Sequence, residues 1–282
     1  MHEPINLSPA AEFAQTGVYL ARALFTPEEC DAYTAHYMEL RKEERPGDFA
    51  GVDSTSEDPW KRYPRMIHMH RWDTISMQWG TDPRLDRMMT ELMGESPIFV
   101  QTMLYYKAAG ARGQALHQDN FYLRAKPGTC IAAWLALDDC DEENGCLQVI
   151  RGTQDLPMLC TVAADTAQSF SDVTVVLPEG LNPEPVVMSR GDVLFFNGSL
   201  IHGSYPNSSK DRFRRALIGH YISGSAKQVG LFYHPAYRMD GTLVELEDSP
   251  QATRCGTWVE VDGTPVVELI DTGSHSQIAT HE

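Results

Sequence analysis

The stretch Leu116-His117-Gln118-Asp119-Asn120 is the part of this sequence on which the interpretation of its fold depends, and a glycine-broken loop precedes it. Side chains two residues apart on a β-strand point to the same face of the sheet. If the stretch is a strand or a strand edge, the imidazole of His117 and the carboxylate of Asp119 reach toward one point. On its own, a pair of this kind is more often a hydrogen-bonded His and Asp than a metal site.

A second histidine farther along the chain makes this pair a candidate metal site. Residues 191–197 read as a turn followed by an apolar strand, and His202 comes soon after them, next to Gly203. Two histidines and one carboxylate are the ligands that hold Fe(II) on one face and leave the other positions open. We therefore expect His117, Asp119 and His202 to be the metal ligands and to form the catalytic centre.

Two adjacent arginines after the second histidine are candidates for holding an acidic co-substrate. Arg214 and Arg215 lie near the start of an apolar run that reads as a strand. A guanidinium group can form two parallel hydrogen bonds to a carboxylate, which is what the distal carboxylate of 2-oxoglutarate would need. Adjacent residues on a strand face opposite ways, so only one of the two can point inward.

The patterns of apolar residues and turn residues predict a mainly β (α+β) protein. Eight short strands would form a double-stranded β-helix, the jelly-roll or cupin-like fold, with helices covering its outside. The predicted helices are 8–16, 26–41 and 82–93, a first strand is 18–24, and the strands of the barrel lie near 98–106, 115–119, 130–137, 146–150, 185–188, 192–197, 201–204 and 214–222. We expect one domain, 1–282, with a helical cover at 8–93, a core at about 98–225 and a C-terminal extension at 226–282, which holds strands at 257–261 and 265–269 and ends in disorder from 271.

Composition narrows the classes of partner. The chain has 282 residues, 42% of them hydrophobic, with a net charge of −16 and a pI near 5.0. A nucleic-acid binder normally shows a basic face, so a small-molecule substrate is favoured over nucleic acid, with the protein a monomer or homodimer. No apolar run approaches the roughly 20 residues of a membrane span. The six cysteines form no Cys-x-x-Cys pair and the N-terminus has no signal-peptide pattern, so we expect free thiols and a cytoplasmic location.

Several motifs, taken in order, resemble the phytanoyl-CoA dioxygenase family of Fe(II)/2-oxoglutarate oxygenases, which includes ectoine hydroxylase. The resemblance covers roughly residues 10–225. The motifs are HQD at 117–119, HGS at 202–204, FRRAL at 213–217, QTMLYYK at 101–107, CIAAWLALDDCDEENGCLQVI at 130–150 and the segment from Phe13 to Cys30. The resemblance implies Fe(II), 2-oxoglutarate and dioxygen as cofactor and co-substrates, and hydroxylation of an unactivated C–H bond of a small metabolite with release of succinate and CO2.

The same resemblance implies roles for residues outside the metal site. Arg214 would hold the distal carboxylate of 2-oxoglutarate, and Ser204 would add a hydrogen bond. Lys107 matches a lysine near the co-substrate, and Trp134 matches an aromatic pocket wall, although a plain core Trp fits nearly as well. Gln101 matches a residue that faces the substrate in ectoine hydroxylase.

Two positions depart from the family pattern. Arg214 lies one residue farther from His202 than is usual, so Arg215 stays a rival for the clamp. Gln154 stands where a histidine is usual, and we expect this change to affect substrate preference rather than chemistry.

The segment 61–71 is a basic island in an acidic chain, and it follows a loop at 44–60 that could cover the site. If the segment is a strand, His68 and His70 share one face, and we expect them to line the pocket with Arg71 and to contact an anionic group of the substrate. Two alternatives stay open. The histidines could be ordinary surface residues, and the basic cluster could pair with an internal Asp or Glu.

Two other functions also stay open at this point. The chain could be a non-oxidative jelly-roll protein that uses its metal structurally, or a cupin-type isomerase or dioxygenase that needs no 2-oxoglutarate. Arg214 and Ser204 discriminate against the cupin-type enzyme, because such cupins lack a dedicated clamp for a carboxylate. The structural metal binder instead predicts no turnover of 2-oxoglutarate.

Overall fold

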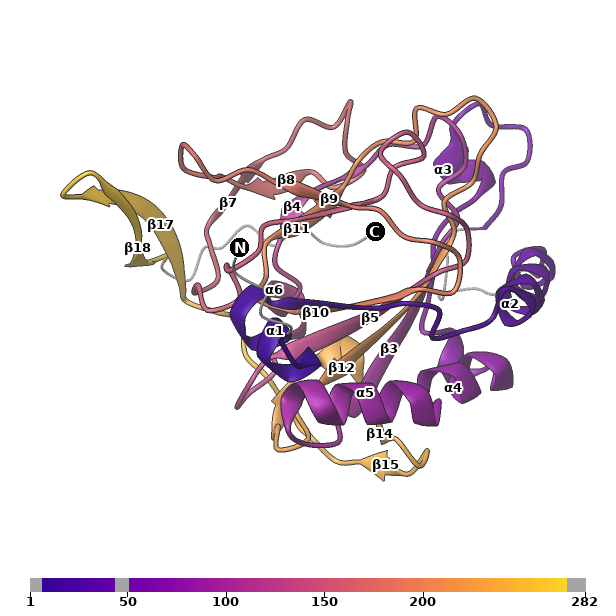
Figure 1. Cartoon of the computed structure of the whole chain (residues 1–282), viewed down its shortest axis with the longest axis horizontal. Coiled ribbons are helices and arrows are strands. Elements are labelled where there is room, and N and C mark those ends of the chain that lie inside the picture. Colours follow the sequence, from indigo (N-terminus) through magenta and orange to yellow (C-terminus); the bar gives the residue numbers. More distant parts are fainter. Residues whose placement is uncertain (1–6, 44–50, 273–282) are drawn as a thin grey trace, which may run out of the picture.

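The computed structural model describes residues 7–43 and 51–272, and two antiparallel sheets facing each other form its centre (Figure 1). The large sheet has the spatial order β1 (Val18–Ala21), β10 (Val193–Asn197), β5 (Cys130–Ala136), β12 (Ala216–Ile222), β3 (Ile98–Tyr105), β14 (Ala236–Arg238) and β15 (Leu243–Val244), with β2 (Met66–Ile67) paired to β3. The small sheet has the order β4 (Gln114–His117), β11 (His202–Ser204), β6 (Leu147–Val149) and β9 (Glu184–Val186). The expected jelly-roll class is confirmed, although the sheets do not close into a barrel.

Helices cover the outer face of the large sheet (Figure 1). They are α1 (Pro9–Thr16), α2 (Pro27–Leu40), α4 (Thr74–Gly80) and α5 (Pro83–Met93). Local sequence sets their starts: Thr26 and Glu29 form a capping box at the beginning of α2, which matches the helix predicted at 26–41. Four short elements lie nearer the site: α3 (Pro59–Arg62), α6 (Asn120–Leu123) and the 3₁₀ turns η1 (Met69–Arg71) and η2 (Leu231–Tyr233).

Strand β5 shows how alternation divides the core between two layers. Its odd-numbered residues, such as Ile131, pack with the helices in the outer core, whereas Trp134 and its even-numbered neighbours face the small sheet. All seven residues of β5 are buried because the strand is central and covered on both faces. Because successive side chains of a strand point to opposite faces of the sheet, Trp134 lies in the space between the two sheets, where the candidate site lies.

The structure corrects three of the strands expected from the sequence. The expected strand at 18–24 ends at Ala21, and the expected strand at 115–119 ends at His117. The expected strand across His68 and His70 is only two residues long, Met66–Ile67, and is followed by the turn η1. A pair of strands, β7 (Thr161–Ala163) and β8 (Val173–Val175), was not anticipated.

The C-terminal extension consists of separate pieces. Strands β14 and β15 extend the large sheet, and β13 (Gln228–Val229) pairs with β16 (Glu247–Asp248). The hairpin of β17 (Arg254–Val261) and β18 (Thr264–Asp271) projects from the body on the left of Figure 1. It is attached through Trp258, whose Nε1 donates to the carbonyl of Val176 at 2.8 Å. The disorder expected from residue 271 falls almost wholly outside the described residues, and the division into one domain stays a prediction.

The cysteines differ from the sequence-based expectation. Cys160 and Cys255 form a disulfide that joins the segment before β7 to β17, so the expectation of free thiols is wrong for this pair. The two residues are separated by 95 positions, and only the fold brings them together. The cytoplasmic location, which depended on free thiols, stays a prediction. Among the described helices, none is long and apolar enough to span a bilayer.

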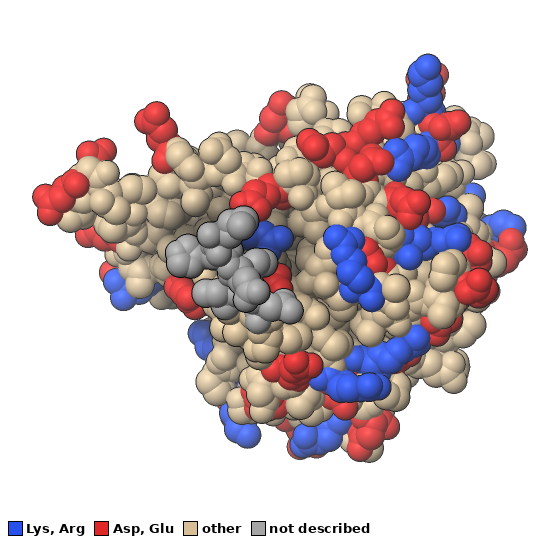
Figure 2. All heavy atoms as spheres, viewed as in Figure 1, with Lys and Arg blue, Asp and Glu red and all other residues tan. Residues whose placement is uncertain are grey.

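Charge is spread unevenly over the drawn face. Figure 2 shows acidic side chains at the tip of the hairpin β17–β18 and along the upper edge, while most Lys and Arg side chains lie among acidic ones. The face shown therefore carries no extended basic surface of the kind that a nucleic-acid backbone requires.

Candidate metal centre and cavity

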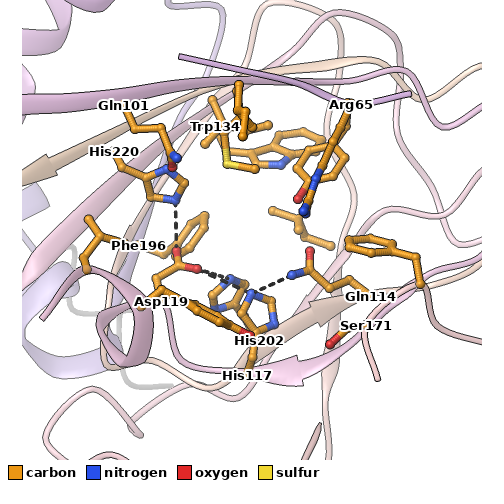
Figure 3. A pocket seen from close by; sticks show the side chains of 18 of the residues that line it. Arg65, Gln101, Gln114, His117, Asp119, Trp134, Ser171, Phe196, His202 and His220 are labelled. Carbon is orange, nitrogen blue, oxygen red and sulfur yellow. Dashed lines mark hydrogen bonds and ion pairs between the residues drawn. The ribbon is translucent and has the colours of Figure 1, made fainter. Parts of the chain in front are cut away.

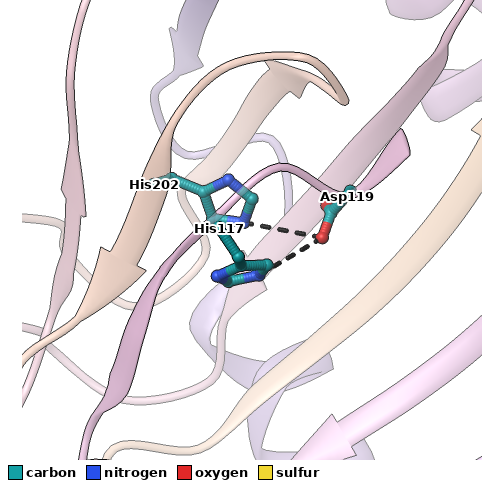
Figure 4. A group of neighbouring side chains, drawn as sticks. All are labelled: His117, Asp119 and His202. Carbon is teal, nitrogen blue, oxygen red and sulfur yellow. Dashed lines mark ion pairs between the residues drawn. The ribbon is translucent and has the colours of Figure 1, made fainter. Parts of the chain in front are cut away.

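Three side chains with metal-ligand chemistry meet between the two sheets. The ligand atoms of His117, Asp119 and His202 all lie within 4.8 Å of one another, and all three residues are buried (Figure 4). The Nε2 atoms of His117 and His202 lie 3.4 Å and 3.7 Å from Oδ1 of Asp119. The two histidines are direct cross-strand partners on β4 and β11, which explains why their rings lie side by side.

Asp119 reaches this point by a route that the strand argument did not foresee. Strand β4 ends at His117, and Asp119 has helical backbone angles at the start of α6, with φ −60° and ψ −36°. The backbone N–H of Asn120 donates to the carbonyl of Gly198 at 2.8 Å, which ties this turn to the loop before β11. The ligand set is thus assembled by a strand end and a helical turn, not by one strand face.

Backbone carbonyls fix the orientation of both imidazoles. Nδ1 of His117 contacts the carbonyl of Ala115 at 2.9 Å, and Nδ1 of His202 contacts that of Leu200 at 3.1 Å. A carbonyl only accepts hydrogen bonds, so each Nδ1 carries the proton and each Nε2 presents a lone pair toward Asp119. This is the arrangement of a histidine that binds a metal ion through Nε2.

The protonation states also fit a cation. Burial, together with the neighbouring His117, lowers the pKa of His202 to about 4, so its ring is neutral near pH 7. Burial by itself would raise the pKa of Asp119, but nearby His202 and His220, together with the hydrogen bond from His220, hold it well below its usual range. Two imidazoles and one carboxylate are a donor set that suits Fe(II).

The three residues face a cavity of about 370 Å³ (Figure 3). Its walls are largely aromatic: Tyr105, Tyr122, Trp134, Phe170, Phe196, Phe232 and Tyr233. The polar lining residues outside the triad are few, namely Arg65, Gln101, Gln114, Ser171, Asp172 and His220. An apolar cavity with a few convergent polar groups is the usual form of a small-molecule site.

Arg214 and Arg215 point to opposite sides, as expected for neighbours entering a strand. The guanidinium carbon of Arg214 lies 5.1 Å from the centre of the Trp134 ring, and its Nε donates to the carbonyl of Gly145 at 3.0 Å. Its Nη1 is buried and has no hydrogen-bond partner among the described residues. Arg215 instead forms a two-point ion pair with Asp138.

A second buried cation lies beside Arg214. Lys107 is 1% exposed, and its Nζ donates to Oγ of Ser204 at 2.8 Å and to the carbonyls of Gly145 and Tyr205. Burial, and then the charge of Arg214, lowers the pKa of Lys107 well below its usual value. In the part of the chain that the structure describes, no carboxylate forms a salt bridge with Lys107 or Arg214, so this buried basic corner is suited to an anionic ligand.

Of the four residues expected to contact the substrate, one lines the cavity and three lie behind its wall. Gln101 on β3 lines the cavity, but His68, His70 and Arg71 are not among its lining residues. The ring of His68 packs 4.6 Å from that of Phe232, which lines the cavity, and Arg71 donates to the carbonyl of Phe232 at 2.8 Å. These three residues therefore support the wall from behind.

The alternative of two surface histidines is also wrong. His68 and His70 are 2% and 3% exposed. His68 has a left-handed backbone with φ 58°, and neither of its ring nitrogens has a partner within the described residues. Burial, and then the charge of Arg71, lowers the pKa of His68 to about 2 and that of His70 to about 3. From the segment 61–71, Arg65 and Ile67 line the cavity, so Arg65 is the basic residue of the segment that reaches it.

Gln154 lies away from the site. Its Nε2 donates to the carbonyl of Ala14 at 2.9 Å, near the end of α1, and it does not line the cavity. A role in substrate preference therefore gains no support from its position. Of the loop at 44–60, residues 44–50 lie outside the described ranges, and Trp60 of α3 packs 4.6 Å from the ring of Phe170 in the cavity wall.

The sequence argument missed two polar neighbours of the triad. Nε2 of His220 lies 3.2 Å from Oδ2 of Asp119, and Nε2 of Gln114 lies 3.1 Å from Nε2 of His117 (Figure 3). Alternation along β12 could have indicated His220, because it shares a strand face with Ala216 and Ile218, which pack between the sheets.

Comparison with known proteins supports the family expected from the motifs. Residues 13–216 match the model of the family described as Phytanoyl-CoA dioxygenase (PhyH). A relative described as Phytanoyl-CoA dioxygenase 1, from Oryza sativa subsp. japonica, is 28% identical over 155 residues, which are 55% of each chain. A 2-aminoethylphosphonate dioxygenase from uncultured bacterium HF130_AEPn_1 is 31% identical over 150 residues, 51% of this chain and 54% of that protein. The chain spans about half the length of most curated relatives that it matches.

Solved structures share the fold at lower identity. EctD from S. alaskensis with 2-oxoglutarate and 5-hydroxyectoine has a TM-score of 0.63 at 17% identity, covering 89% of this chain and 92% of that chain. The epimerase SnoN in complex with Fe3+, alpha ketoglutarate and nogalamycin RO has a TM-score of 0.61 at 20% identity, covering 78% and 84%. At these identities the similarity establishes the fold alone.

Proposed function

Since the chain belongs to the phytanoyl-CoA dioxygenase family, we propose that it is an Fe(II)- and 2-oxoglutarate-dependent oxygenase that hydroxylates an unactivated C–H bond of a small metabolite. Succinate and CO2 would be the co-products. The observation that carries this proposal is the buried set of His117, Asp119 and His202 facing an aromatic cavity.

The three residues would hold the iron in the manner of a facial triad. His117 and His202 present Nε2, and Asp119 presents Oδ1, from one side of a common point. Three protein ligands leave positions open, and iron bound there would supply the activation of dioxygen. The protein itself would orient the reactants, and the aromatic side chains that line the cavity would exclude water from it.

The basic corner formed by Arg214, Lys107 and Ser204 would hold 2-oxoglutarate by its distal carboxylate. Arg214 has a buried Nη1 that needs an acceptor, and Lys107 is held beside it through Ser204. Two buried cations that lack a carboxylate partner in the described chain would be compensated by this anion. Trp134 lines the cavity with its ring centre 5.1 Å from the guanidinium carbon of Arg214, and it would form one wall for the co-substrate.

The remaining space would take a small substrate that carries an anionic group. Arg65 lines the cavity with its guanidinium carbon 5.6 Å from the Phe170 ring centre, and Gln101 lines the side that holds His220 (Figure 3). An arginine in a largely apolar cavity favours a carboxylate, phosphate or phosphonate in the substrate. The relative named for 2-aminoethylphosphonate is consistent with an anion of this kind.

Hydroxylation is the proposed outcome, and the product decides it. Structures with the same fold include an alpha ketoglutarate-dependent epimerase and carbocyclase, so proteins of this fold can have other outcomes. A substrate that gains one oxygen atom supports hydroxylation, whereas a product of unchanged mass or one lacking two hydrogens contradicts it.

The decisive experiment is anaerobic binding of Fe(II) followed by 2-oxoglutarate, monitored by the visible charge-transfer band of their complex. A screen of small metabolites in air would then record succinate release. We expect the band in the wild-type protein and its loss in Asp119→Ala. If the wild type shows neither the band nor 2-oxoglutarate turnover, the protein is a non-oxidative metal binder or a cupin of another class.

A further inference from the structure

A third histidine, His220, contacts the metal site through the carboxylate of Asp119. Nε2 of His220 lies 3.2 Å from Oδ2 of Asp119, the oxygen that is turned away from the two ligand histidines (Figure 3). The other oxygen, Oδ1, faces His117 and His202. The two carboxylate oxygens therefore have different partners before any metal binds.

The contact determines which ring nitrogen of His220 carries a proton. A carboxylate oxygen accepts hydrogen bonds, so Nε2 of His220 must donate to Oδ2 of Asp119. If the lone pair of Nε2 faced the carboxylate instead, two acceptors would meet in a buried site, which is unfavourable. His220 is 6% exposed, so water cannot readily replace this donor.

The fold holds His220 rigidly in this direction. It lies on β12, between β3 and β5 in the middle of the large sheet, and pairs with Gln101 and Ala132. The pairing of β12 with β3 shifts register between His220 and Tyr221. Such bulges often re-aim a side chain beside an active site. A ring held by strands on both sides can act as a fixed support for a mobile carboxylate.

We propose that His220 is a positioning residue that keeps Asp119 bound to the metal through one oxygen only. This inference rests on the proposed metal site. With Oδ2 held by His220, Asp119 would offer Oδ1 alone, and the position that a chelating carboxylate would occupy stays open for the 2-oxoglutarate that the site must admit.

A role as fourth metal ligand does not fit the geometry as well. The described residues whose ligand atoms all lie within 4.8 Å of one another are His117, Asp119 and His202, and His220 is outside this group. Among the described residues, its ring contacts Oδ2 of Asp119 through Nε2 and its Nδ1 has no hydrogen-bond partner, and Oδ2 lies on the side of the carboxylate away from the two ligand rings. His220 therefore acts on the metal through Asp119.

Variants of His220 test the proposal with Co(II), a redox-stable probe, under conditions that need no turnover. His220→Phe keeps a buried ring but removes the donor, whereas His220→Gln keeps an N–H at about the reach of Nε2. His36→Phe is the matched control, because Nε2 of His36 lies 3.1 Å from Asp73 in a His–Asp pair far from the triad in sequence. Calorimetry would measure Co(II) affinity, then 2-oxoglutarate affinity of each Co(II) form.

We expect His220→Phe to weaken Co(II) binding by about 10- to 100-fold, the usual effect of losing a partner of a metal ligand. Its Co(II) form should also bind 2-oxoglutarate more weakly and show an altered visible spectrum, because the released carboxylate can chelate. His220→Gln should restore most of the affinity. His36→Phe should bind Co(II) like the wild type, and thermal unfolding of the metal-free variants would verify that each is folded.

A double variant separates this role from a direct one. If His220 acts only through Asp119, adding His220→Phe to Asp119→Ala should weaken Co(II) binding no further than Asp119→Ala alone. An additive loss, or wild-type affinities in a folded His220→Phe variant, would overturn the proposal and leave the proposed function intact. If the wild type and Asp119→Ala bind Co(II) equally, the metal site itself fails and both proposals fall.

Discussion

Arg215 closes a two-point ion pair on Asp138, with Nη2 2.6 Å from Oδ1 and Nε 2.8 Å from Oδ2. Arg215 was the other candidate for the co-substrate clamp, and this ion pair engages its guanidinium group. Arg214, its neighbour in sequence, faces the opposite way and keeps a buried Nη1 that has no partner in the described ranges. Sequence spacing left both arginines as candidates, and the pairing of Arg215 with Asp138 is the reason why we propose Arg214 as the clamp.

The first prediction tests the clamp. Arg214→Ala should raise the apparent Michaelis constant for 2-oxoglutarate at least tenfold, because a charge-assisted hydrogen bond contributes about 1.5–3 kcal/mol. Arg215→Ala should leave that constant nearly unchanged and instead lower the free energy of unfolding by about 1 kcal/mol, as expected for a partly exposed ion pair. Succinate release at varied 2-oxoglutarate and urea denaturation measure the two effects. Equal increases of the constant in both variants would contradict the assignment.

The second prediction concerns the metal ligands. His117→Ala, Asp119→Ala and His202→Ala should each reduce 2-oxoglutarate turnover at limiting Fe(II) to the background of the metal-free protein, since each removes one of three ligands. His36→Ala breaks another His–Asp pair and serves as the control. Near-normal succinate release in any one of the three variants would exclude that residue as a ligand.

The third prediction tests the anionic substrate. Small acids and their neutral amides or esters would be compared by succinate release with the wild type, Arg65→Gln and Arg71→Gln. Arg65→Gln should reduce turnover of the acids by tenfold or more and affect the neutral analogues much less, because Arg65 lines the cavity. Arg71→Gln should change the turnover of acids relative to their neutral analogues less than Arg65→Gln does, since Arg71 donates to the backbone of Phe232 behind the cavity wall. A true substrate whose neutral analogue reacts equally well in all three proteins would disprove the role of Arg65.

The fourth prediction is a loss of stability in mild acid. In the folded protein the pKa of His68 is about 2 and that of His70 about 3, both lowered mainly by burial from 6.5. Below pH 6.5 the unfolded chain therefore takes up protons that the folded protein does not, so the free energy of unfolding falls as the pH falls. Each histidine contributes up to about 1.4 kcal/mol per pH unit in this window.

Urea denaturation of the metal-free protein between about pH 7.5 and about pH 5.5 measures this slope. His68→Leu should reduce it, because Leu does not titrate and the nitrogens of His68 make no hydrogen bond to the described residues. An unchanged slope in His68→Leu would show that His68 becomes protonated in the folded protein.

The fifth prediction concerns the disulfide. Replacing Cys160 and Cys255 together by Ser should lower the free energy of unfolding by about 2–4 kcal/mol, because the bond closes a long loop in the unfolded chain. Metal affinity should change little, since the backbone of Cys160 still donates to the carbonyl of Gly256 at 2.9 Å. Thermal unfolding with and without a thiol reductant, together with Co(II) titration, measures both. An equal midpoint in the double variant would contradict the disulfide.

The sequence by itself determined the elements and the chemistry of the ligands. The helix predicted at 26–41 is α2, and apolar runs between turn residues predicted the central strands, because caps, apolar runs and turn residues are properties of consecutive residues. The identity of His117 and His202 as a pair followed from the ligand types and their motifs, and the structure places them in direct register.

Only the tertiary structure decided which side chains meet. Asp119 enters the site from a helical turn, Arg215 is held by Asp138, and His68 lies buried behind Phe232 instead of on a strand face. These outcomes depend on segments that are far apart in sequence and pack against one another. Local patterns specify the direction of a side chain relative to its own strand or helix, but the distance between two such elements is set by the packing of the whole core.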